Sequence, residues 1–248
     1  MRKTYAAPEF ALFNREALYF FSCFFHNFWD NFDIDDILKD IFTHNFFDLL
    51  SEMVAFSLGH KCKYLTALLE IYNTIFMIKN EEPLRELYSN FQATFTMLFD
   101  QIHPDNKGKY NRMLINLITN VAYADKAIAG ELIDHGYFNG LIELLVMDSA
   151  SYLNVLHTLD IIIDVADEQH LAKLFGAFPD LPTTLLAISN NNQAFDVCNS
   201  IYEILLYFLK ANDSDFRLVD SITTSEDYLR LEDMRKQSEK LKTINAES

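Results

Sequence analysis

The sequence is poor in glycine, proline and cysteine, and each shortage narrows the kind of protein that it encodes. Among 248 residues there are six glycines and five prolines, which suits a mostly helical chain. The three cysteines, Cys23, Cys62 and Cys198, are odd in number and far apart, and no CxxC spacing occurs among them. That pattern predicts free thiols in a reducing compartment.

Basic residues are also scarce, because 20 Lys and Arg stand against 36 Asp and Glu, a formal net charge of −16. A molecule this acidic is repelled by nucleic-acid phosphates, so we expect no nucleic-acid partner. It is attracted to basic segments of other proteins, although the same charge also serves simple solubility.

No short motif of a known catalytic or nucleotide-binding site occurs: GxSxG, HExxH, the P-loop and GxGxxG are all missing. Two histidine-containing groups stand out in the sequence: His60 with Cys62, and His170 with Asp160, Asp164 and Asp167. Structural zinc needs four ligands with a second spaced pair, and neither group provides them. We therefore expect no enzyme, no catalytic residues, no metal and no cofactor. The remaining alternative is a helical enzyme whose site is assembled from distant residues.

The longest apolar run, Ala17–Trp29, has 13 residues, whereas a membrane-spanning helix needs about 20. Polar residues interrupt the region before it and no small-residue cleavage site follows. We expect a buried helix here, no membrane span, and a cytoplasmic or nuclear protein. Phe21, Phe25 and Trp29 exceed what one end helix needs, so either residues 1–13 or a partner should cover them.

The chain repeats itself with a nearly constant period. Equivalent apolar positions are Leu50, Phe95, Leu141, Leu185 and Leu229, spaced by 45, 46, 44 and 44 residues. This spacing lies within the range of about 40–47 residues known for two types of helical repeat unit. We predict that the first four of these residues are buried.

Each repeat contains a short helix, a second helix around the equivalent apolar residue, and a long helix. The short helices are expected at 34–42, 82–89, 126–134, 168–176 and 215–222. The long helices are expected at roughly 14–29, 61–78, 109–123, 151–166 and 194–210. Gly136 and Gly176 are predicted to end two of the short helices.

The stretch Glu131–Leu145, ELIDHGYFNGLIELL, is the most specific part of the pattern. From Asp134 to Leu145 it resembles the signature of an armadillo repeat, in which an acidic residue and a glycine end the short first helix and L-x-x-L-L forms the second. Asn139 stands where that family usually has proline. Three helices per unit also favour armadillo over two-helix HEAT repeats.

The resemblance implies an all-α, armadillo-like right-handed superhelix of about five three-helix repeats, forming a single domain over residues 1–248. Residues 1–30 would be an aromatic N-terminal cap, 31–223 the repeats, and 224–248 a charged, solvated C-terminal capping helix. Within that last helix we expect i, i+4 ion pairs such as Glu226–Arg230 and Glu232–Lys236.

The resemblance also implies a function, because armadillo proteins that bind extended peptides carry a tryptophan and, four residues on, an asparagine on the third helix. In Leu114–Ala122, LINLITNVA, Asn120 matches the asparagine and Asn116 stands in the place of the tryptophan. Shifting by the repeat spacing gives the remaining predicted partner-binding residues: Glu70, Thr74, Asp160, Asp164, Ile204 and Phe208.

We therefore expect a scaffold or adaptor that binds an extended protein segment, carrying Lys or Arg, along an acidic concave groove. A solvated helix face without a ligand is the alternative for the polar positions. Ile204 and Phe208 would make an apolar contact or be buried under the last helix. The other functional hypothesis is a structural or regulatory subunit held in a larger complex by its aromatic N-terminal end. Oligomeric state is not indicated.

Overall fold

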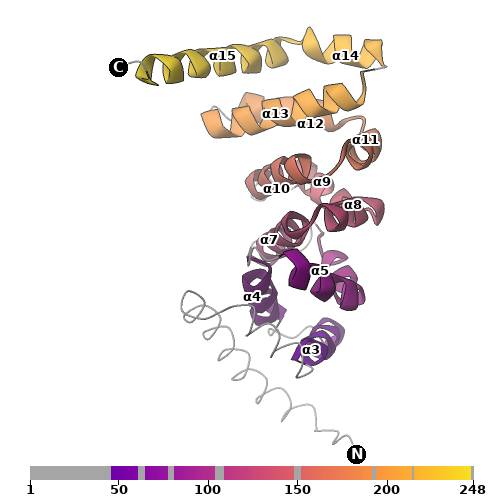
Figure 1. Ribbon diagram of the computed structural model, residues 1–248. Coiled ribbons are helices and arrows are strands. Elements are labelled where there is room, and N and C mark those ends of the chain that lie inside the picture. The colour runs from indigo at the N-terminus through magenta and orange to yellow at the C-terminus, as the bar shows by residue number, and fades with distance from the viewer. Residues whose placement is uncertain are drawn as a thin grey trace, which may run out of the picture. The chain divides into compact units, whose positions relative to one another are not determined.

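The computed structural model describes residues 46–60, 65–77, 81–103, 109–147, 152–191, 194–213 and 215–246, and every regular element in these ranges is an α-helix (Figure 1). The helices are α3 (Phe46–His60), α4 (Leu65–Phe76), α5 (Glu81–Asn90), α6 (Gln92–Phe99), α7 (Lys109–Ala124), α8 (Lys126–Asp134), α9 (Phe138–Met147), α10 (Tyr152–Val165), α11 (Glu168–Gly176), α12 (Leu181–Asn191), α13 (Phe195–Ala211), α14 (Phe216–Thr223) and α15 (Glu226–Ala246). The all-α prediction is confirmed for the described residues. The predicted helices at 14–29 and 34–42, and the aromatic residues Phe21, Phe25 and Trp29, lie outside them.

The helix boundaries follow the expected pattern closely. The short helices at 126–134 and 168–176 are α8 and α11 as predicted, and α5 and α14 lie within one residue of their predicted bounds. The long helices α4, α7, α10 and α13 also occupy their predicted places, although residues 61–64 and 78 of the predicted helix at 61–78 lie outside the described residues.

The described chain forms two compact units. Unit 1 comprises α3 to α7, and unit 2 comprises α8 to α15 together with His103. The prediction of one repeat domain over the whole chain stays a prediction.

Aspartates begin three of the short helices in unit 2. The Asp125 carboxylate accepts hydrogen bonds from the backbone N–H groups of Ala127, at 2.6 Å, and Ile128. Asp167 caps α11 and Asp215 caps α14 in the same way. A side-chain oxygen at this position satisfies N–H groups that have no partner inside the helix, and its negative charge favours the positive end of the helix dipole. Part of the acidity of the chain therefore serves helix initiation.

Gly136 ends α8 with a backbone that other residues adopt only under strain. Its φ is 74°, in the left-handed region. The N–H of Tyr137 donates to the carbonyl of Leu132 at 3.2 Å, and the N–H of Gly136 donates to that of Ile133 at 3.0 Å. This pair of bonds is the Schellman motif. Helix α11 ends at Gly176 as predicted, but by a different geometry, because Gly176 is the last helical residue and Gly136 alone has positive φ among the glycines in the described ranges.

Unit 1 is built around Phe95 on α6. Its ring contacts four aromatic rings, at centroid distances of 5.3–6.0 Å, and these belong to Tyr72, Phe76, Tyr88 and Phe99. The helices of this unit stack in a regular order, with α3 against α6 and α4 against α7. In unit 1, α3 and α4 thus each cover part of their apolar side with the third helix after them.

Unit 2 repeats the same order of packing. Helix α8 contacts α11, α9 contacts α12, α10 contacts α13 and α12 contacts α15. Helix α12 contacts α13, and α15 contacts both of them; Figure 1 shows α15 running lengthwise above α13 in the view. The predicted burial is confirmed in both units, since Leu50, Phe95, Leu141 and Leu185 are at most 1% exposed.

Side-chain hydrogen bonds reinforce this stacking at nearly the repeat spacing. Seven such bonds between helices join residues 39 to 47 positions apart. In unit 2 they include Lys173 to Asp134 and Ser200 to Asp160, each at 2.7 Å. A helix is therefore bonded to its counterpart about one repeat later.

The last helix differs from its prediction in register and in exposure. Tyr228 and Leu231, three residues apart on one face, are buried, whereas Leu229 points more than a third of a turn away from the middle of that face and is 46% exposed. Arg230 donates to Ser189 and Asn190 on α12. The first half of α15 is therefore packed onto α12 and α13 and is not a solvated cap. The predicted Glu232–Lys236 pair is confirmed, at 3.0 Å.

We predict that Leu141→Ala destabilises the protein by about 2–5 kcal/mol, because it opens a cavity in a fully buried place. Urea denaturation followed by circular dichroism measures the loss. Leu229→Ala is the matched control in the same unit and should cost much less, since the side chain is half exposed. Equal losses for the two variants would contradict the assignment of the core.

Gly130 lies so close to the His170 ring that a side chain at this position would collide with the ring. A Cβ at Gly130 would stand 2.7 Å from Cε1 of the His170 ring, on α11, whereas a Cβ at Gly176 meets nothing within 4 Å. Glycine to alanine in a helix interior normally stabilises by about 1 kcal/mol. We predict that Gly130→Ala lacks this gain and regains it when His170→Ala removes the ring.

Thermal unfolding of the single and double variants tests the effect of the ring. Gly176→Ala serves as the reference substitution, and it should not depend on His170. If Gly130→Ala stabilised the parent protein as much as it stabilises the His170→Ala variant, the contact would be unimportant.

Candidate functional site

Four of the predicted partner-binding residues lie in unit 1, on the long helices α4 and α7. Asn116 is exposed, and Glu70, Thr74 and Asn120 are half-buried. The Thr74 hydroxyl donates to the backbone carbonyl of Glu70 at 2.8 Å, within its own helix. Thr74 therefore has its hydroxyl hydrogen engaged, and the two asparagines are the stronger candidates for contact with a ligand.

Asn120 is held by Asn73, a residue that the sequence pattern did not single out. The Asn120 side-chain amide donates to the Asn73 oxygen at 3.1 Å. Asn73 in turn donates to the carbonyl of Leu69 on its own helix, at 2.9 Å, and to that of Met113 on α7, at 3.0 Å. The pair joins α4 to α7 at the edge of the helix pair.

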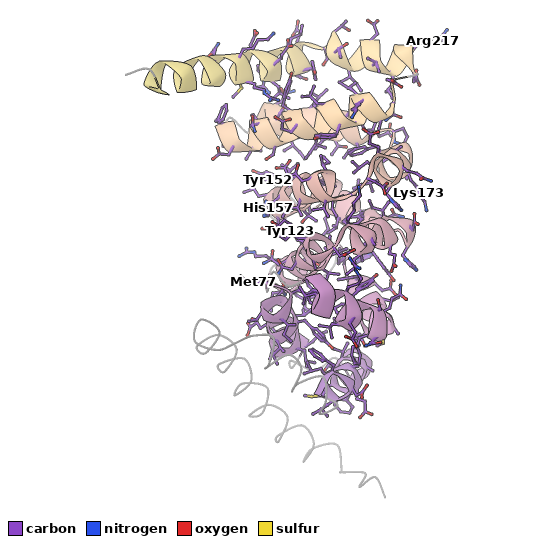
Figure 2. The ribbon with its side chains drawn as sticks, viewed as in Figure 1. Met77, Tyr123, Tyr152, His157, Lys173 and Arg217 are labelled. Carbon is purple, nitrogen blue, oxygen red and sulfur yellow. The ribbon has the colours of Figure 1, made fainter. Side chains whose placement is uncertain are left out.

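Two exposed apolar side chains flank this amide pair. Met77, just after α4, is 67% exposed, and Tyr123, near the end of α7, is 52% exposed. Figure 2 shows both at the same edge of unit 1. We call the set Asn73, Asn116, Asn120, Met77 and Tyr123 the amide surface. It combines hydrogen-bonding groups with apolar area.

The other predicted polar residues, Asp160 and Asp164, lie in unit 2 on α10; Asp160 contacts α13, and Asp164 is exposed. Asp160 is half-buried and accepts a hydrogen bond from the Ser200 hydroxyl at 2.7 Å. Burial raises the pKa of the Asp160 carboxyl above its ordinary value, and the nearby carboxylates of Asp164 and Glu203 raise it further, against the Ser200 hydrogen bond. We call Asp160, Asp164 and Glu203 the acidic surface. His157, on the same helix, is exposed (Figure 2).

Several basic side chains of unit 2 form ion pairs with carboxylates other than Asp160 and Asp164. Lys173 pairs with Asp134 and Lys210 pairs with Glu168, each at 2.7 Å, and Arg235 pairs with Glu203 at 2.5 Å. Arg235 also stacks over the Tyr202 ring at 5.1 Å. Within the described part of the chain, no Lys or Arg pairs with Asp160 or Asp164. These two carboxylates are therefore the uncompensated part of the acidic surface.

Ile204 and Phe208 do not belong to a partner surface. Both are fully buried on α13, at 0% exposure. The Phe208 ring packs edge-on against Phe175 of α11, with centroids 5.6 Å apart. The repeat spacing that placed them on the exposed row fails because α13 is covered by neighbouring helices on this side.

His170 lies in a different cluster from the one that its sequence neighbours indicate. Its Nδ1 is 2.7 Å from Asp167, and its Nε2 is 3.7 Å from Asp134 on α8. Neither Asp160 nor Asp164 takes part in these contacts. Among the described residues, no group of three or more His, Cys, Asp or Glu is arranged to hold a metal ion. Cys62 lies outside those residues.

The sequence pattern missed Asn73, Ser200 and Glu203. Asn73 and Asn120 are 47 residues apart, and Asp160 and Ser200 are 40 apart. Pairs of polar residues separated by about one repeat are therefore the signal that would have found two of the three.

No single helix in the described ranges is long and apolar enough to cross a membrane, and only α11 and α12 together, bent by 82°, pass the same test of length and composition. Comparison with protein-family models, with characterised proteins and with solved structures gives no match to this chain.

We predict opposite effects of neutralising two aspartates in unit 2. The Lys173 hydrogen bond and charge lower the pKa of Asp134, so ionised Asp134 stabilises the fold above the ordinary pKa of 3.8 and loses that effect as the pH falls through its lower folded value. Asp160 has a raised pKa, so ionising it lowers the stability of the fold. The full loss is present at a pH above the raised pKa, and no loss is present at a pH well below 3.8, where the carboxyl is protonated in both states.

Asp134→Asn should therefore lower the melting temperature at neutral pH, and Asp160→Asn should raise it, while both differences vanish in strong acid. Calorimetry as a function of pH measures the two differences. A loss of stability at neutral pH in Asp160→Asn would contradict the assigned cost of that carboxylate.

Proposed function

We propose that the chain is an armadillo-like right-handed superhelix of about five three-helix repeats that binds an extended segment of another protein in the cytoplasm or nucleus. Three observations support the repeat architecture. Within each unit, helices stack on the third helix after them, side-chain bonds recur at about one repeat length, and a Schellman turn at Gly136 ends α8 within the armadillo-like stretch. Repeats of this kind bury their apolar faces by stacking and leave one row of side chains for ligands.

The uncompensated carboxylates of Asp160 and Asp164 carry the functional proposal. Asp134, Glu168 and Glu203 each pair with a Lys or Arg of another helix, whereas neither Asp160 nor Asp164 does so among the described residues. The raised pKa of Asp160 means that its charge is kept at a cost in stability. Such a cost is common where a group serves function. A Lys or Arg side chain of a partner would neutralise the pair and make charge-assisted hydrogen bonds.

The two units offer different chemistry to a ligand. The acidic surface of unit 2 attracts positive charge, whereas the amide surface of unit 1 has asparagine amides with Met77 and Tyr123 beside them. An asparagine amide both donates and accepts, which suits the N–H and C=O groups of an extended backbone. We therefore propose each surface as a separate recognition element, with acidity confined to the second.

The test uses a short capped peptide of alternating lysine and alanine, and a second peptide with glutamine in place of lysine. Asp160→Asn combined with Asp164→Asn should weaken binding of the lysine peptide about threefold to tenfold, as expected for two partly exposed ion pairs. Added salt should weaken binding to the parent protein in the same direction. Isothermal titration calorimetry or fluorescence anisotropy gives the affinities.

Glu143→Gln combined with Asp220→Asn is the matched control, because it removes the same charge from exposed positions on α9 and α14. If this control weakened binding as much as the Asp160 and Asp164 variant, attraction would come from net charge alone and the site would be wrong. Absence of any binding by the parent would leave the structural-subunit hypothesis, whose aromatic segment lies outside the described residues.

A further inference from the structure

We propose that Asn73 is a positioning residue that fixes the orientation of the Asn120 amide, so that the amide surface recognises the backbone of an uncharged, extended segment. The inference rests on the proposed function and adds a residue and a ligand class to it. The resemblance places a ligand contact at Asn120 alone and assigns no role to Asn73.

The hydrogen bonds of Asn73 leave its side chain one orientation. Its NH₂ group lies between the backbone carbonyls of Leu69 and Met113, at 2.9 and 3.0 Å, and carbonyl oxygens can only accept. A flipped amide would place oxygen against oxygen at both contacts. The Asn73 oxygen therefore has to face Asn120.

The orientation of Asn120 follows from that of Asn73. Because the Asn73 oxygen accepts, Asn120 has to present an N–H to it, as the 3.1 Å contact shows. Among the described residues, nothing bonds to the Asn120 oxygen or to its second N–H. A half-buried amide is thus held with one acceptor and one donor still available, which lowers the entropy cost of binding a ligand.

The charges and flanking side chains define the ligand class. Among the described side chains, helices α4 and α7 carry one carboxylate, Glu70, and one cation, Arg112, so this face has no excess of negative charge to attract a basic segment. Met77 and Tyr123 supply exposed apolar area at the same edge (Figure 2). The geometry therefore suits a peptide group, bound through its N–H and C=O, with an apolar side chain next to it.

The first arm of the test needs no ligand. NMR measures hydrogen exchange of the two side-chain amide protons of Asn120, with exposed Asn116 as the internal reference. In the parent protein, one Asn120 proton should exchange more slowly than those of Asn116. In Asn73→Ala, both Asn120 protons should exchange at the Asn116 rate. If neither proton is slowed in the parent, the positioning inference is wrong, whatever peptides do.

The second arm measures binding of a capped peptide of alternating threonine and alanine, beside an analogue whose backbone N–H groups are methylated. Asn120→Ala and Asn73→Ala should each weaken binding of the first peptide about threefold to tenfold, the effect of one or two neutral hydrogen bonds. The methylated analogue keeps its carbonyl acceptors but has no N–H donors, so it should bind the parent more weakly and lose less affinity in these variants than the first peptide does. Asn90→Ala, the same kind of change at an exposed place on α5 outside the amide surface, is the matched control and should leave affinity unchanged.

The double variant separates positioning from general folding. If Asn73 acts through Asn120, then Asn73→Ala has no further effect on affinity once Asn120 is alanine. An equal additional loss in that background would show that Asn73 only supports packing, and would overturn the inference. If neither peptide binds the parent at all, backbone recognition at this surface is wrong, even where the exchange arm shows an oriented amide.

Discussion

The structure depends on one constraint: no helix of this chain can bury its apolar side by itself. The short helices have only eight to ten residues, too few to be stable alone in water. Within each unit the third helix along supplies the missing cover, as α6 does for α3 and α13 does for α10. The buried leucines and phenylalanines recur at the same interval because each occupies the same place in this stacking.

This constraint explains why the sequence predicted the described helices well. A side chain that must face its counterpart one repeat later imposes a period that can be read directly, and Leu50, Phe95, Leu141 and Leu185 obey it. The period fails where the environment changes. At the C-terminal end Tyr228 and Leu231 take over from Leu229, because the packing partner of α15 there is the α12–α13 pair with Arg230 reaching across.

The candidate site could be predicted less fully, for a physical reason. A repeat places residues on a face but does not say what covers that face, so Ile204 and Phe208 were put on a surface that α11 and other helices bury. Nor does it show which polar groups bond to each other. Asn73 and Ser200 acquire their roles only from a neighbour about one repeat away.

The acidic residues of the chain likewise have different structural roles. Asp125, Asp167 and Asp215 satisfy helix N-termini, and Asp134 and Glu168 bind lysines of a neighbouring helix. Asp160 and Asp164 have neither use. Net charge alone could not distinguish these groups, and only their surroundings show that Asp160 and Asp164 have no Lys or Arg partner among the described residues, which is why we propose them as a recognition surface.

The one-repeat span of the side-chain bonds also bears on how such a chain folds. Closing a loop of about 40 residues costs entropy that grows only with the logarithm of its length, and the seven interhelical side-chain hydrogen bonds described above span 39 to 47 residues. The search for native contacts is therefore local on the scale of one repeat, which keeps folding rates from falling steeply with chain length. If one repeat were duplicated, the surface formed by the long helices would gain one helix. The added repeat would need contacts only with its neighbours, about one repeat away along the chain.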